Sequence, residues 1–170
     1  MSTRKAAIRP KIRQFLFKVM HEVFRIGDFW SHIQAVAERQ FCATCGTTES
    51  MDHMLIHCRC RPARQIWSLA KETWPHRNIP RPEIDLGTIL GCGGLSVQQA
   101  INNTVQDGNQ QQTNNAHHRG ASRLLQILIS ESAFLLWVLR CERVIQEKTH
   151  SNQETRSRWL SVIKLETHRR

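Results

Sequence analysis

The residues best suited to chemistry gather in one stretch, FCATCGTTESMDHMLIHCRCRPARQIW, which covers residues 41–67. It holds four of the six cysteines and two of the nine histidines of the chain. The N-terminus, MSTRKAAIRPKIRQ, is basic and has no apolar signal core, so we expect a reducing, intracellular compartment. There, clustered cysteines bind metal more often than they form disulfides. Mixed thiolate and imidazole ligation favours Zn²⁺.

The spacing identifies two ligands and leaves a choice for the others. Cys42 and Cys45 form a C-x2-C pair followed by Gly46, which lets two thiolates reach one ion from a tight turn. The other two ligands come from four candidates: His53, His57, Cys58 and Cys60.

Helix geometry weighs these candidates without settling the choice. His53 and His57 lie four residues apart, on one face of a helix, so geometry alone slightly favours them. Cys58 lies about 140° from His53 on an ideal helix, so it can join the site only where the helix ends or unwinds. Pro62 makes an ending near Cys60 reasonable.

The run C-x2-C-G-x2-E-x3-H-x4-C, followed by R-x-I-W, resembles the zinc-binding segment of reverse transcriptases from non-LTR retrotransposons. The flanking runs KIRQFLFKVMHEVFRIGDFW, LGTILGCG and LISESAFLLWVLRCERVI resemble the same family in its fungal members. The resemblance covers most of the chain except the Gln/Asn-rich segment. It implies the ligands Cys42, Cys45, His53 and Cys58, leaves His57 and Cys60 spare, and gives Glu49 a place at the start of the ligand-bearing helix.

The elements that must position these residues are all helical. Apolar spacing predicts helices over residues 10–26, 28–40, 61–74, 121–147 and 151–167, with a short helical turn after residue 85. In the first helix we expect six residues to face inward: Ile12, Phe15, Leu16, Val19, Met20 and Val23. In the last helix we expect Trp159, Leu160, Ile163 and Leu165 to pack.

The domain organisation follows from these elements. We expect an all-α fold: a small helical domain with a zinc knuckle inserted between helices and a long central helix in the C-terminal half. Residues 10–92 form the zinc-binding segment, and residues 121–167 form a helical pair that packs on it. Residues 93–120, rich in Gln and Asn, are expected to be a disordered loop because they can bury little apolar surface.

The helix over residues 121–147 is apolar nearly all round, and a membrane span is its rival interpretation. Glu131 lies near its middle and Arg140 interrupts its apolar run. A charge at the bilayer centre costs roughly 2.5 kcal/mol or more, so we expect a core helix and no membrane partner. Ser130 and Ser132 then form a polar notch with Glu131, not a nucleophilic site.

The charge balance suggests a polyanionic partner. The chain has 24 Lys plus Arg against 14 Asp plus Glu, a formal net charge of +10. RNA or DNA would suit this balance, although a basic protein without a charged partner is the alternative. The candidate phosphate contacts are Arg59, Arg61, Arg64, Lys11, Lys18 and Arg25.

Catalysis finds little support in the sequence. The acidic residues are scattered, and a chain with no Tyr cannot carry the Tyr-containing acidic motif of a reverse transcriptase. The resemblance therefore implies a non-catalytic fragment that binds nucleic acid or supports other domains of a retroelement polyprotein, with the nucleus as a suitable location. A purely structural zinc domain and a metal-dependent hydrolase are the alternatives; the hydrolase would need an open zinc position.

Overall fold

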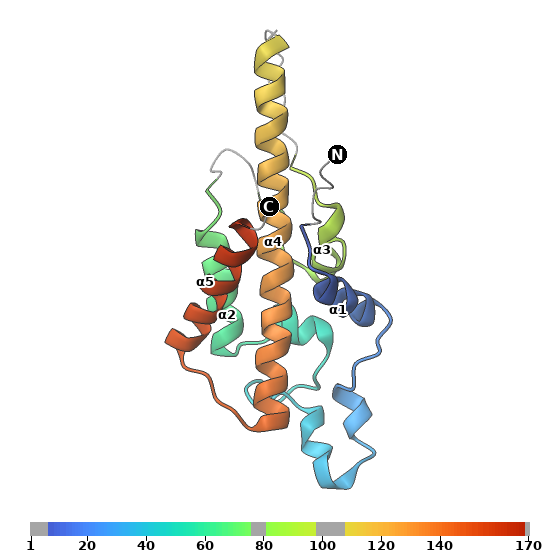
Figure 1. The fold of residues 1–170 in the computed structure, drawn as a ribbon. Coiled ribbons are helices and arrows are strands. Elements are labelled where there is room, and N and C mark those ends of the chain that lie inside the picture. Colours follow the sequence, from blue (N-terminus) through green and yellow to red (C-terminus); the bar gives the residue numbers. More distant parts are fainter. Residues whose placement is uncertain (1–6, 76–80, 98–107, 169–170) are drawn as a thin grey trace.

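The computed structural model describes residues 7–75, 81–97 and 108–168. Over these residues the protein is all-α, and its one β-type pairing is an isolated bridge between Phe41 and Thr48. The elements are α1 (Pro10–Met20), η1 (Gly27–Trp30), η2 (Gln34–Gln40), η3 (His53–His57), α2 (Arg61–Glu72), α3 (Leu86–Leu90), η4 (Cys92–Gly94), α4 (Gly108–Gln146) and α5 (Asn152–His168). Figure 1 shows that the other helices surround the long helix α4. The predicted fold class is confirmed.

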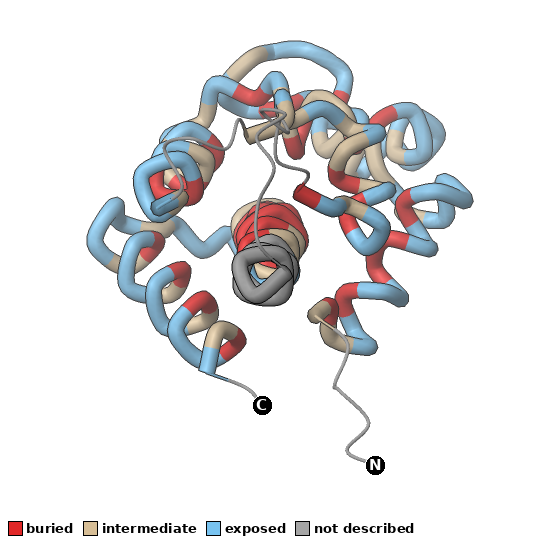
Figure 2. Tube along the Cα trace, turned by 90° about the horizontal axis from the view of Figure 1, so that it is seen from above, coloured by how far each residue is buried: buried red, intermediate tan, exposed pale blue. Residues whose placement is uncertain are grey.

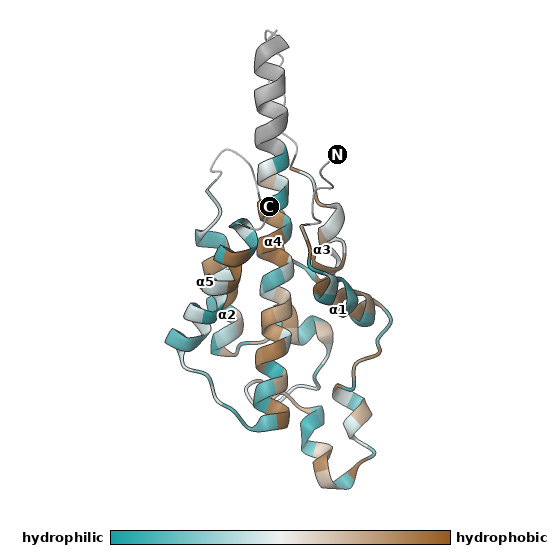
Figure 3. Cartoon of the chain, viewed as in Figure 1, coloured by the Kyte–Doolittle hydropathy of each residue, from teal (hydrophilic) through white to brown (hydrophobic). Residues whose placement is uncertain are grey.

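Helix α4 forms the axis of the molecule. Seen along this axis, α4 lies in the centre with buried residues on several sides (Figure 2). Its stretch Arg119–Gln146 is long and apolar enough to cross a membrane, and 67% of its most apolar window is buried by the rest of the protein. Hydropathy colouring shows the apolar residues of α4 in the middle of the molecule (Figure 3). Packing against the surrounding helices therefore accounts for an apolar composition that extends nearly all round the helix.

Helix α1 packs through the predicted face but ends early. Ile12, Phe15, Leu16 and Val19 are buried, whereas Met20 and Val23 are 58% and 60% exposed. The prediction that these last two residues face inward was wrong. The helix ends at Met20, and Glu22 adopts a positive φ of 52°, which turns the chain away from the helix axis.

The second predicted helix, residues 28–40, is instead two short 3₁₀ segments, η1 and η2. Val36 has non-helical backbone angles that interrupt η2. Phe29 and Ile33 are 43% and 42% exposed, so these apolar residues do not face inward. A 3₁₀ helix rarely extends beyond a few residues, so these segments present no continuous apolar stripe.

Helices α2 and α3 lie where the sequence predicted a helix and a short helical turn. Pro62 lies in the first turn of α2, and Ala63, Ile66 and Ala70 are buried. Asp85 caps α3 by accepting a hydrogen bond from the Thr88 amide at 2.6 Å.

The predicted Gln/Asn-rich loop is a helix in its second half. Helix α4 begins at Gly108, not near residue 121, while residues 98–107 lie outside the described part of the chain. The start of the segment is also fixed: the Val97 amide donates to Ser122 Oγ at 2.8 Å, and Gln126 Nε2 donates to Leu95 O at 2.8 Å. A helix already nucleated by core packing extends at low cost into Gln-rich sequence, because Gln is a good helix former.

Helix α5 closes the molecule against α2 and α4. Ser151 caps it by accepting a hydrogen bond from the Glu154 amide at 3.1 Å. Trp159 and Ile163 are buried as predicted, and Trp159 Nε1 donates to Ser132 Oγ at 2.9 Å. Leu160 and Leu165 are 44% and 65% exposed, so the prediction that they pack was wrong.

Candidate metal centre

A tight turn holds the first two cysteines. The carbonyl of Cys42 accepts hydrogen bonds from the amides of Cys45 and Gly46, at 3.2 and 2.8 Å. Gly46 has a φ of 69°, in the left-handed region that glycine adopts without strain. The Cys42 amide donates back to Thr47 O at 2.8 Å. These bonds direct the backbone so that both thiols of the C-x2-C pair lie on one side of the turn.

A widened helical turn brings the other two residues to the same place. Residues His53–His57 form a π-helix, in which the Cys58 amide donates to His53 O at 2.6 Å. A bond between residues five apart places them one above the other, which a regular α-helix does not do. Cys58 itself is extended, with a ψ of 127°. The condition that the sequence set for Cys58, a helix that ends or unwinds before it, is therefore met.

The four side chains converge on one point. One donor atom from each of Cys42, Cys45, His53 and Cys58 lies within 4.8 Å of the others, so the group could hold a metal ion. The Cys42 and Cys58 sulfurs are 3.6 Å apart. The Nε2 atom of His53 is buried and has no hydrogen-bond partner among the described residues. A buried ring nitrogen without a partner is costly, and coordination of an ion would satisfy it.

The two spare candidates point elsewhere. His57 is 66% exposed, and its Nε2 lies 3.1 Å from Asp52 Oδ2, outside the cluster. Cys60 lies beyond the group of four but beside Cys58; their hydrogen bond raises the pKa of Cys58 and lowers that of Cys60 to about 6. The geometry thus places Cys58, and not His57, with the first three residues.

The surroundings of the Cys45 sulfur favour the thiolate. The backbone amide of Arg59 donates to Cys45 Sγ at 3.4 Å, and this bond is the main cause of the lowered pKa of the Cys45 thiol. In contrast, burial raises the pKa of Cys92 to about 11, as expected for a core thiol. Three sulfurs and one imidazole fill a tetrahedral coordination sphere, which is the arrangement of structural zinc sites.

A buried ion pair fixes the cluster to the central helix. Glu49 lies four residues before His53, and its carboxylate accepts a 2.7 Å hydrogen bond from Arg140 Nε on α4. Their side chains are 2% and 3% exposed. The Glu49 amide also donates to Gln40 O at 2.8 Å, and a Cβ at Gly27 would lie 2.2 Å from Glu49 O. Glu49 therefore connects the cysteine turn to the core, and it lies just before the helical residues that begin at Met51.

The role of Arg140 in this pair was not predicted from the sequence. A signal was present, since a charged residue inside an apolar helix that packs as core requires a partner. The sequence could not show which of the scattered acids that partner is, because Glu49 is 91 residues away in the chain.

The predicted phosphate contacts divide into two groups. Arg59, Arg61 and Arg64 are exposed at the end of the cysteine segment and along the start of α2. Lys11 and Lys18 are exposed on α1, but Arg25 lies beyond the end of this helix and over the Phe29 ring. Lys11, Lys18 and Arg25 therefore do not lie along one helix.

The Ser130, Glu131 and Ser132 notch is structural. All three residues are buried. Glu131 accepts a 2.7 Å hydrogen bond from Arg9 Nε, and Ser132 accepts one from Trp159. Burial raises the pKa of Glu131. The notch connects α4 with the N-terminal segment and with α5, as the interpretation of a polar core cluster predicted.

The fold and the cluster together define an all-α protein with three cysteines and one histidine that could hold one metal ion. No protein family model, no curated protein and no solved structure matches this chain.

Proposed function

We propose that the cluster binds Zn²⁺ and that the chain is a non-catalytic nucleic-acid-binding module of the zinc-binding type found in non-LTR retrotransposon reverse transcriptases. The observation that carries the proposal is the convergence of the four donor atoms within 4.8 Å of one another. They are the four residues that the resemblance implied. A turn and a π-helix, which the resemblance did not predict, bring them together.

Zinc is the ion that this donor set favours. Thiolate ligands exclude the hard cations Mg²⁺ and Ca²⁺, and a sphere of sulfur and imidazole suits Zn²⁺. Four protein ligands leave no open position for a substrate or a catalytic water, so the proposal assigns the ion a structural role and no enzymatic one.

The first experiment is metal analysis of the purified chain. We expect one Zn²⁺ per chain in the wild type, a large loss in Cys58→Ser, and no loss in His57→Ala, because His57 faces Asp52 and solvent. Full zinc content in Cys58→Ser together with loss in His57→Ala would refute the assignment of ligands.

The exposed arginines beside the cluster support the choice of nucleic acid. Arg59, Arg61 and Arg64 lie within six residues of Cys58 and are exposed. A closed zinc site fixes the backbone that carries them, so less conformational entropy is lost when phosphates bind. The net charge of +10 acts in the same direction.

The second experiment is a titration with single-stranded RNA and DNA at several salt concentrations. The wild type should bind with an affinity that falls as the salt concentration rises. The variant Arg59→Ala/Arg61→Ala/Arg64→Ala should reduce the slope of log affinity against log salt concentration by about 2, because each of the three lost phosphate contacts accounts for about 0.7. Its control is a triple Ala variant at Arg13, Arg156 and Lys164, which are exposed on α1 and α5.

A purely structural zinc domain is the second candidate, and the Glu49–Arg140 pair favours it. This pair attaches the cluster to the core, which a supporting domain of a larger polyprotein would also need. Nucleic-acid binding that is absent, or that has no salt dependence, would favour this candidate over the first.

A further inference from the structure

A cavity of about 220 Å³ lies directly beside the candidate metal centre. Its walls come from the cysteine segment, the first residues of α2, the last turns of α4 and the connection to α5. From this cavity we infer that the protein has a phosphate-binding site, and that its ligand is a backbone phosphate of single-stranded nucleic acid. The inference rests on the proposed function and gives it a defined point of contact.

The lining of the cavity is strongly cationic. Four permanently charged basic side chains line it, against one carboxylate, that of Glu49: they are Arg61, Arg140, Arg143 and Lys148. Glu49 is already bound to Arg140, and its other oxygen lies 3.5 Å from Arg143. Lys148 is in turn paired with Glu154, and Cys60 forms a hydrogen bond with Arg143, so the charge is partly neutralised. The lining nevertheless keeps an excess of positive charge, which favours an anion.

Arg143 contacts Glu49 and Cys60 but keeps a donor without a partner in the part of the chain that the structure describes. Its Nε is buried and has no hydrogen-bond partner among the described residues, although its side chain is 30% exposed as a whole. A guanidinium has five N–H donors in a planar fork, which matches the oxygens of a phosphate. A phosphate in the cavity would accept hydrogen bonds from the Arg143 guanidinium, and the remaining phosphate oxygens would stay in contact with solvent.

The start of α2 adds to the positive potential. Arg61 and Pro62 begin this helix of twelve residues, and both line the cavity. Amides in the first turn of a helix carry partial positive charge that favours an anion. Arg61 is exposed, so its side chain is free to close over a bound phosphate.

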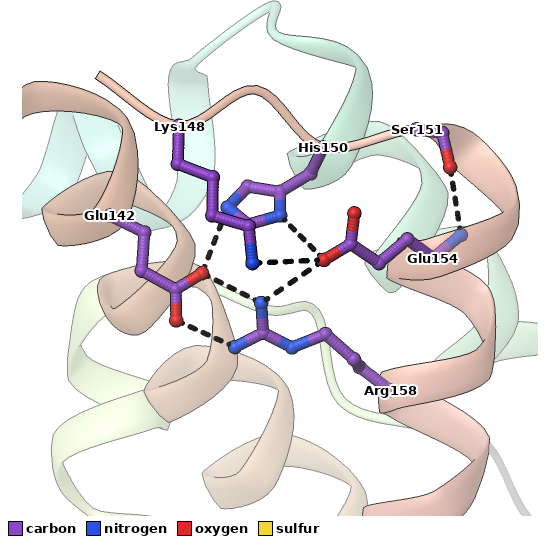
Figure 4. Close-up of polar contacts among 6 residues, drawn as sticks. All are labelled: Glu142, Lys148, His150, Ser151, Glu154 and Arg158. Carbon is purple, nitrogen blue, oxygen red and sulfur yellow. Dashed lines mark hydrogen bonds and ion pairs between the residues drawn. The ribbon is translucent and has the colours of Figure 1, made fainter. Parts of the chain in front are cut away.

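The part of the lining that contains Lys148 and His150 is fixed by a polar cluster where α4 meets α5. Figure 4 shows His150 between the carboxylates of Glu142 and Glu154, with Lys148 and Arg158 around them. The ring nitrogens of His150 lie 2.9 Å from Glu142 and 3.1 Å from Glu154. Lys148 Nζ lies 3.4 Å from Glu154, and its side chain remains 51% exposed. These contacts hold Lys148 and His150 in the cavity wall.

The apolar part of the cavity lining explains why we infer a nucleic-acid phosphate and not a free ion. Met54, Leu136 and Leu139 contribute apolar surface to this lining. A free phosphate ion gains nothing from apolar contacts, whereas a nucleotide unit can place its sugar or base against them. The cavity thus fits a phosphate with an organic group attached.

The test compares matched charge changes in the zinc-loaded chain. Arg143→Gln and Arg61→Gln remove cations from the cavity. Arg156→Gln and Arg13→Gln remove the same charge from exposed positions outside it, on α5 and α1. With short single-stranded oligonucleotides we expect each cavity variant to lose affinity about ten-fold, and each control to lose about two-fold or less. If Arg143→Gln fails to fold, the pair Arg61→Gln and Arg156→Gln decides alone.

A second arm uses inorganic phosphate at constant ionic strength, read as a rise in the midpoint of thermal unfolding that Arg143→Gln abolishes. Oligonucleotide binding that cavity and control variants weaken equally would overturn the inference and leave the proposed function intact. Phosphate binding that needs Arg143, with no oligonucleotide binding by the wild type, would overturn the proposed function and the nucleic-acid ligand together, and would leave only an anion site.

Discussion

Two regions of this protein are held together in different ways. Between residues 125 and 136, α4 is buried almost continuously. In the turn that carries Cys42 and Cys45, residues 43–48 are exposed or half-buried. Buried apolar surface therefore stabilises the helical region, whereas the turn depends on backbone hydrogen bonds and on the metal ion that we propose for its thiols. A small region that cannot form a core needs a metal or a similar constraint.

The largest effect should come from metal removal, which separates the two regions directly. A chelator should abolish amide exchange protection over residues 41–60, because apparent binding energies of structural zinc sites are about 10–16 kcal/mol. Protection in the middle of α4 should persist. Hydrogen exchange read by mass spectrometry makes this measurement. If the turn kept its exchange protection without metal, its stability would not depend on the ion, and the proposed difference between the two regions would be wrong.

The next effect should come from the contact that joins the regions. Arg140→Ala leaves the Glu49 carboxylate buried without its main partner, so we expect a loss of about 3–5 kcal/mol in the free energy of unfolding. Urea denaturation measures it, with the exposed Arg156→Ala as a control that should change stability by roughly 0.5 kcal/mol or less. A small loss in Arg140→Ala would mean that the two regions are independent.

A smaller effect should be confined to the helical region. Trp159→Phe keeps most of the buried volume but removes the hydrogen bond to Ser132 Oγ. We expect a loss of about 1–2 kcal/mol in unfolding free energy. Zinc content should stay at the wild-type value, since Trp159 lies on α5, away from the four candidate ligands. A fall in zinc content would show that the packing of α5 is coupled to the metal centre, which would contradict the separation of the two regions.

The smallest effect should appear in acid. Hydrogen bonds from Arg158, at 2.7 and 2.9 Å, lower the pKa of Glu142. Because the pKa is lower in the folded chain, this contact stabilises it fully above the unfolded value of about 4.3, and the contribution is lost as pH falls through the folded pKa. The thermal midpoint of the wild type should therefore fall more steeply below about pH 4 than that of Glu142→Gln. Protonation of zinc ligands affects both chains equally, so parallel curves would contradict the prediction.

The sequence by itself determined the helical class and the location of the metal candidates. Apolar periodicity predicted α1, α2, α4 and α5, because helical spacing is a property of neighbouring residues. The C-x2-C pair and the nearby His and Cys residues lie within nineteen positions, so their close spacing alone identifies them as metal candidates. On geometry, however, the sequence slightly favoured His57, and the resemblance was needed to prefer Cys58.

Tertiary structure decided what depends on residues far apart in the chain. The π-turn that brings Cys58 to His53, the early end of α1 and the exposure of Met20 and Leu165 depend on how segments pack. The Glu49–Arg140 pair and the cationic cavity join residues about ninety positions apart. Local patterns cannot encode such contacts, because many alternative partners satisfy the same spacing and only the packed chain selects one of them.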